Sequence, residues 1–204
     1  GNRSEKTKAQ PLLICYSLIN RPYILDFQRQ RSVVRQISEA GFDVYLLDWG
    51  TPGLADCHVD LSDYIMIRLH QAVEFVCQHG KSEQLSLMGY CLGGTMAAMY
   101  TATHPERIRN LLLMAAPIDT YAVQGLLQLW ADPTYFDVDR LVDTLGNCPG
   151  ELLQFCFQML RPVQNFYEKY ATLAEKLDDE DYLVDFQAME RWTTDSVPIA
   201  GTAF

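Results

Sequence analysis

The sequence lacks the features that mark several protein classes. It contains no uninterrupted apolar run of about 18 residues, which argues against a membrane-spanning helix within it. Basic side chains are few: the sequence has 16 Lys and Arg but 26 Asp and Glu, which gives a formal net charge of −10. A nucleic-acid binder needs a concentrated basic surface, so this balance argues against nucleic acid as a partner. Residues 1–10 are polar and basic and lack the apolar core of a signal peptide.

Paired cysteines and metal-ligand spacings are also missing. None of the six cysteines forms a C-x-x-C pair, and the four histidines do not recur at the spacing of a metal site. A chain this rich in Leu, Ile and Val can build an apolar core without disulfides. We therefore expect reduced thiols, a cytoplasmic location and no metal.

Strand and helix patterns alternate along the first half of the chain. Apolar runs at 12–16, 43–48, 84–88 and 110–116 predict buried strands, and the spacing at 26–40, 61–79 and 92–103 predicts helices. Strands that alternate with helices form a parallel sheet covered on both faces. After Pro117 the pattern is helical and is broken by prolines. The fold class is therefore α/β, with a partial core over residues 1–118 and a helical cap region over residues 119–204.

The most specific motif is the run 89–94, Gly-Tyr-Cys-Leu-Gly-Gly, between a predicted strand and a predicted helix. It has the spacing of a nucleophile elbow, with Cys91 where hydrolases usually carry serine. Gly89, Gly93 and Gly94 provide the small neighbours that such a tight turn requires. The helix N-terminus favours thiolate over thiol, and the backbone N–H of Leu92 is placed to donate to an oxyanion.

A second loop follows the first predicted strand and spans residues 16–23. In an α/β hydrolase this loop supplies the other oxyanion donor, which we expect to be the backbone N–H of Leu18 or Ile19. Arg21 is a weaker candidate, for contact with an anionic substrate group, and a solvated loop arginine is at least as good an interpretation. For Cys91 the alternative is a small buried hydrophobe, which the strand–turn–helix context disfavours.

In their order along the chain, these motifs resemble polyhydroxyalkanoate synthases, and most closely the short catalytic subunits that work with a second, smaller subunit. The resemblance covers nearly the whole chain. It rests on the stretches 11–26, 43–50, 89–94, 104–111, 189–192 and 200–204. It implies an α/β-hydrolase core with a cap and a Cys-His-Asp constellation, in which Cys91 attacks the thioester of a 3-hydroxyacyl-coenzyme A.

The resemblance also implies the surroundings of the reaction. Coenzyme A leaves, the growing polyester chain stays on the sulfur, and no cofactor is needed beyond the coenzyme A thioester substrate. The expected partners are a second synthase subunit and further copies of the chain, with association at the surface of polyester granules.

One part of the implied constellation has no match in this sequence. In the family the catalytic Asp and His follow the cap on late core strands, and no Asp or His up to Phe204 fits those motifs. We therefore expect a chain that is truncated before these strands and that exposes an apolar sheet edge near 111–114. Two alternatives stay open: a thioesterase or other hydrolase on the same core, and a non-catalytic piece that acts by association.

Overall fold

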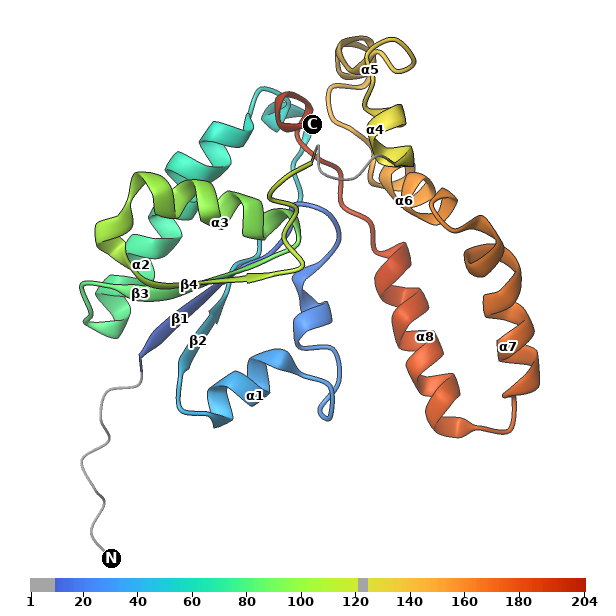
Figure 1. Ribbon diagram of the computed structural model, residues 1–204, viewed down its shortest axis with the longest axis horizontal. Helices are drawn as coiled ribbons and strands as arrows, with labels where there is room; N and C mark the ends of the chain where they lie inside the picture. Colours follow the sequence, from blue (N-terminus) through green and yellow to red (C-terminus); the bar gives the residue numbers. More distant parts are fainter. Residues whose placement is uncertain (1–9, 121–124) are drawn as a thin grey trace, which may run out of the picture. The chain divides into compact units, whose positions relative to one another are not determined.

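The computed structural model describes residues 10–120 and 125–204 and divides the chain into two compact units (Figure 1). The first unit is built from Gly1–Leu18, Pro22–Trp49 and Leu61–Asp119, and the second from Ile19–Arg21, Gly50–Asp60 and Thr120–Phe204. Two short segments from the first part of the chain thus belong to the second unit. The division into a core over 1–118 and a cap over 119–204 stays a prediction.

The first unit contains a sheet of four parallel strands. These are β1 (Pro11–Cys15), β2 (Asp43–Leu46), β3 (Leu85–Tyr90) and β4 (Ile108–Met114). Their order in the sheet is β2-β1-β3-β4, and every neighbouring pair is parallel. The α/β prediction is confirmed, because each crossover between parallel strands passes through a helical segment.

Helices cover both faces of this sheet. They are α1 (Val33–Glu39), α2 (His70–Gly80) and α3 (Leu92–Thr103), and Figure 1 shows α1 on one side and α2 with α3 on the other. Leu12, Ile14 and Tyr16 pack in one cluster with residues of α1, among them Val33 and Ile37. Alternate residues of a strand point to opposite faces, so Leu13 and Cys15, also buried, face α2 and α3.

The prediction of a helix over 26–40 is wrong at its start. Pro22–Leu25 forms a 3-10 turn, and α1 begins only at Val33. The hydroxyl of Ser32 accepts a hydrogen bond from the backbone N–H of Arg35 at 2.8 Å and itself donates to the carboxylate of Asp26. Ser32 is thus the N-cap of α1. Because an N-cap residue has a non-helical backbone, the helix starts after it and does not extend back to residue 26. The next predicted helix, over 61–79, is confirmed, with a π-helical turn at Asp63–Leu69 ahead of α2.

The second unit is helical. Besides 3-10 turns at Leu54–Asp56 and Gly201–Ala203 and a π-helical turn at Gln164–Glu168, it contains α4 (Leu126–Trp130), α5 (Val138–Leu145), α6 (Gly150–Met159), α7 (Lys169–Glu175) and α8 (Glu180–Thr194). Helices α7 and α8 lie side by side (Figure 1), joined by an ion pair between Lys169 and Glu190 at 2.9 Å. The described part of this unit contains no strand, only an isolated bridge between Cys148 and Ile199.

Strand β4 forms one edge of the sheet. Among the described residues no further strand pairs with its outer side. Leu112 is 44% exposed and Leu113 is 45% exposed. Since these neighbours point to opposite faces, the edge strand exposes an apolar side chain on each of its faces. The expected apolar edge is therefore present.

No helix in the described ranges combines the length and the apolar character that crossing a membrane requires.

Candidate active site

Cys91 occupies the turn between β3 and α3, and its backbone is strained. Its dihedral angles are φ 53° and ψ −131°, a combination that L-residues with a Cβ rarely adopt. Such a conformation costs on the order of 1–3 kcal/mol and persists only where the surrounding structure enforces it. The predicted elbow is therefore present, and the strain lies at the candidate nucleophile itself.

Hydrogen bonds hold this turn in place. The backbone N–H of Cys91 donates to the carbonyl of Met114 at 3.0 Å, which ties the elbow to the end of β4. The N–H of Gly94 donates back to the carbonyl of Cys91 at 2.8 Å. The hydroxyl of Thr95 donates to the carbonyl of Pro117 at 2.8 Å. The chain after β4 thus braces the elbow, a role for Thr95 that the sequence motif did not indicate.

The three glycines of the motif are required for space and not for an unusual φ. A Cβ on Gly93 would lie 2.5 Å from the backbone carbonyl carbon of Tyr16 and would also press on the carbonyl oxygen of Cys15. A Cβ on Gly89 would lie 2.8 Å from the carbonyl oxygen of Gly93, and one on Gly94 would overlap Ala116. Real Cβ atoms do not approach backbone this closely, so the elbow packs against the ends of β1 and β4 only with glycine at these positions.

Two tyrosines and a tryptophan surround the same corner of the sheet. The rings of Tyr90, beside the nucleophile, and Tyr16, at the end of β1, stack with centroids 5.5 Å apart. The indole N–H of Trp49 donates to the carbonyl of Tyr16 at 2.8 Å. Burial first and the neighbouring Cys91 second raise the pKa of Tyr90 above its ordinary value. Sequence reasoning missed this aromatic group, although Tyr90 and Tyr16 both stand at the ends of adjacent parallel strands.

The candidate oxyanion donors belong to different parts of the structure. Leu92 is the first residue of α3, where backbone N–H groups have no partner within the helix. Leu18 is 6% exposed and belongs to the first unit, close in sequence to the Tyr16 backbone against which Gly93 packs. Ile19 belongs to the second unit and packs against a cluster that contains Cys148. The roles of all three as donors stay predictions.

Arg21 has partners within the second unit. Its Nε donates to a carboxylate oxygen of Asp195 at 3.3 Å, and one terminal nitrogen donates to the carbonyl of Gly50 at 3.5 Å. Its own carbonyl accepts the indole N–H of Trp192 at 2.8 Å. The end of α8 thereby holds the loop that carries Ile19. The solvated-arginine alternative does not describe this side chain, and contact with a substrate anion stays a prediction.

His104 lies at the end of α3 opposite Cys91. The helix has 12 residues, so about 18 Å separate its ends. The His104 ring stacks on Tyr100 with centroids 4.6 Å apart and lies 4.9 Å from the ring of His70. A nitrogen of His70 is within 2.9 Å of the Tyr100 hydroxyl. These histidines form an aromatic cluster at the far end of the helix, too far from Cys91 for His104 to act as its base.

No three His, Cys, Asp or Glu side chains within residues 10–120 and 125–204 are grouped so that they could hold a metal ion.

The six cysteines differ in their burial and in their thiol chemistry. Burial raises the pKa of Cys15 to about 12, and burial first and the neighbouring Cys156 second raise that of Cys148 to about 11. Cys91 is half-buried at a helix N-terminus. Because the thiolate is the reactive form, the structure separates a reachable thiol at Cys91 from an inert one at Cys15.

We expect iodoacetamide at pH 8 to alkylate Cys91 while Cys15 stays unmodified in the folded protein. With a pKa of about 12, only about one Cys15 thiol in ten thousand is ionised at that pH. Raising the pH toward 12 makes Cys15 progressively reactive, because its thiolate fraction then grows. Mass spectrometry resolves the two sites, since the tryptic peptide 82–107 contains no cysteine besides Cys91. Equal alkylation rates at pH 8 contradict the assignment, and unfolding in urea is the control in which both thiols react.

Comparison with known proteins identifies similar chains. A sequence model of the alpha/beta hydrolase fold matches residues 10–198. The chain is 43% identical over 202 residues to the poly(3-hydroxyalkanoate) polymerase subunit PhaC of Haloferax mediterranei. The aligned region covers 98% of this chain and 41% of the relative. It is 40% identical over 194 residues to the PhaC subunit of Thiocystis violacea, covering 95% of this chain and 54% of the relative. The chain spans about half the length of the curated relatives it matches.

Similarity to solved structures is lower. A carboxylesterase of the thaumarchaeon Nitrososphaera gargenis has a TM-score of 0.43 and 15% sequence identity, covering 71% of this chain and 48% of that one.

The resemblance to polyhydroxyalkanoate synthases seen in the sequence motifs is confirmed by these identities. The family model extends over most of the chain, and the parallel sheet with its strand–turn–helix elbow has the architecture that this model describes. The chain belongs to the α/β-hydrolase fold family.

Proposed function

We propose that this chain carries the nucleophile of an acyltransferase that polymerises 3-hydroxyacyl-coenzyme A into polyhydroxyalkanoate. The observation that carries the proposal is the strained Cys91 at the β3–α3 elbow. The similarity to proteins named poly(3-hydroxyalkanoate) polymerase subunits supports the choice of substrate and product.

The first step is acyl transfer to sulfur. The Cys91 thiolate attacks the thioester carbonyl, and the tetrahedral oxyanion accepts hydrogen bonds from backbone N–H groups, with Leu92 as one donor and Leu18 or Ile19 as the other. The bond between the carbonyl carbon and the coenzyme A sulfur then breaks, and coenzyme A leaves as a thiol after taking up a proton. The acyl group remains on Cys91 as a thioester.

The second step forms the ester bond. A general base removes the proton from the hydroxyl of another 3-hydroxyacyl unit, and the alkoxide oxygen attacks the acyl-Cys91 carbonyl. The carbon–oxygen bond forms, the carbon–sulfur bond to Cys91 breaks, and the thiolate is regenerated. Exchange between thioesters is nearly isoenergetic, so the acyl-enzyme stays reactive toward a hydroxyl. The resemblance to polyhydroxyalkanoate synthases implies that this base is a His oriented by an Asp. Neither of the two is assigned to a residue of this chain.

The remaining expectations belong to the same proposal. The reaction uses no cofactor besides the coenzyme A thioester. The curated relatives are named as subunits, which supports a second synthase subunit as a partner. Self-association, a cytoplasmic location and association with granules follow from the resemblance.

The test uses the full-length protein and a 3-hydroxyacyl-coenzyme A. We expect insoluble polyester together with release of coenzyme A, and an acyl adduct on the tryptic peptide 82–107 when the reaction is quenched early. Free 3-hydroxy acid as the product would assign the chain to the thioesterase alternative. A peptide that never carries an acyl group, with no product of either kind, would leave only association as its role.

A further inference from the structure

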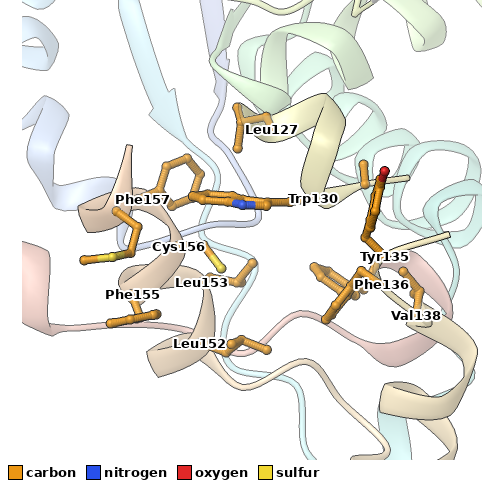
Figure 2. A pocket seen from close by; sticks show the side chains of 13 residues that line it. Leu127, Trp130, Tyr135, Phe136, Val138, Leu152, Leu153, Phe155, Cys156 and Phe157 are labelled. Atoms are coloured by element: carbon orange, nitrogen blue, oxygen red, sulfur yellow. The ribbon is translucent and has the colours of Figure 1, made fainter. Parts of the chain in front are cut away.

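An apolar pocket lies in the second unit, between α4, α5 and α6. Its cavity volume is about 680 Å³, within the range of about 300–1,000 Å³ that small-molecule sites occupy. Figure 2 shows Leu127 and Trp130 of α4, Tyr135 of the following loop, and Phe155 and Cys156 of α6 around this space. None of the roles assigned to Cys91 and the glycines of the elbow uses this pocket.

The lining restricts the chemistry of an occupant. Among the residues that the structure describes, no charged side chain lines the pocket. A phosphate or a free carboxylate would lose its hydration there without an ionic partner, which is costly. The coenzyme A moiety and a free hydroxy acid are therefore poor occupants.

The lining offers few polar groups. The indole N–H of Trp130 can only donate, whereas the hydroxyl of Tyr135 can donate or accept. A neutral, apolar ligand that carries acceptors and no donors fits this set. An extended protein segment fits less well, because its several backbone N–H groups would find one side-chain oxygen acceptor in the described lining, the hydroxyl of Tyr135.

We propose that this pocket binds a segment of the polyester chain, an inference that rests on the function proposed above. The interior of a poly(3-hydroxyalkanoate) chain is neutral, bears apolar substituents, and has ester oxygens that only accept hydrogen bonds. Leu127 is 53% exposed and Phe155 is 54% exposed, so both side chains are open to such a ligand and lose apolar surface to water when it binds. The pocket thus adds a site for product chain to the nucleophile at Cys91.

Binding is tested without catalysis, in the full-length Cys91→Ala protein. The ligand is a short oligomer of 3-hydroxybutyrate, acetylated at its hydroxyl end and methylated at its carboxyl end, so that it is neutral. Isothermal titration calorimetry is expected to show saturable binding. The oligomer is also expected to slow the alkylation of Cys156, whose side chain lines the pocket.

A matched pair of variants locates the site. Leu127→Asp places a charge in the lining and is expected to weaken oligomer binding at least about tenfold. Leu129→Asp is the control, because Leu129 lies in the same helix, is 49% exposed, and is not part of the lining. Trp130→Phe keeps an aromatic ring but removes the N–H donor together with part of the apolar surface, and is expected to weaken binding about threefold to tenfold. Circular dichroism confirms that each variant is folded.

Several outcomes overturn the proposal. These are absence of oligomer binding, equal loss in Leu127→Asp and Leu129→Asp, and equally tight binding of dodecyl acetate, which has one ester group and a plain alkyl chain. A change of sedimentation coefficient in Leu127→Asp without oligomer binding assigns the pocket to a contact between copies instead. Since these measurements use the Cys91→Ala protein, their failure is separate from a failure to find acyl-Cys91 in the wild type.

Discussion

Replacing Cys91 with alanine in the full-length protein is expected to abolish polymer formation, with a rate loss of about four orders of magnitude or more. The reason is chemical, because the sulfur is the atom that receives the acyl group and no other side chain of the elbow can replace it. The rate of coenzyme A release and the amount of polyester are measured together. Full activity of the alanine variant would end the assignment of Cys91 as nucleophile.

Two further substitutions at the same position separate chemistry from folding. Cys91→Ser is expected to keep at most trace activity, since a hydroxyl requires a stronger base than a thiol. Cys91→Gly is expected to be as inactive as the alanine variant. It should also raise the free energy of unfolding by up to about 1 kcal/mol, because glycine adopts a φ of 53° without the strain of a Cβ. Denaturant unfolding of the three variants provides this comparison.

Replacing Gly93 with valine is expected to lower the free energy of unfolding by about 3 kcal/mol or more and to abolish activity as well. The new Cβ would lie 2.5 Å from the backbone of Tyr16, so the elbow or the end of β1 must move. Backbone cannot yield as a flexible side chain does, which places this change at the upper end of overpacking costs. Denaturant unfolding and polymerisation assays measure the two effects.

Gly125→Val is the matched control for this substitution. A Cβ at Gly125 meets no atom of the described residues within 4 Å, and its φ of −165° is ordinary extended backbone. The expected loss is about 1 kcal/mol or less, the size of an N-cap effect. A stable, fully active Gly93→Val protein would mean that the tight packing of the elbow does not exist in solution.

Local patterns in the sequence determined the architecture of the first unit. The run 89–94 predicts both the position of Cys91 and the start of α3, because an elbow of this kind is made by residues adjacent in the chain. The helix predicted over 92–103 has the same limits in the structure. The acidic run 178–181 predicts a helix start, and Asp179 indeed caps α8 by accepting the N–H of Tyr182 at 3.0 Å. Periodicity and capping act within a few residues, so one sequence suffices to find them.

Only the tertiary structure decided the contacts between residues distant in the chain. The pairing of Arg21 with Asp195 joins positions 174 residues apart, and neither the pattern of 16–23 nor that of α8 indicates it. The same holds for the stacking of Tyr16 on Tyr90 and for the assignment of residues 19–21 and 50–60 to the second unit. The apolar pocket likewise forms where three short helices of the second unit come together, which the helical pattern after Pro117 does not indicate. Such contacts depend on how the helices and strands pack. Many apolar and polar surfaces have the same local sequence pattern, so the pattern alone does not indicate which of them come together.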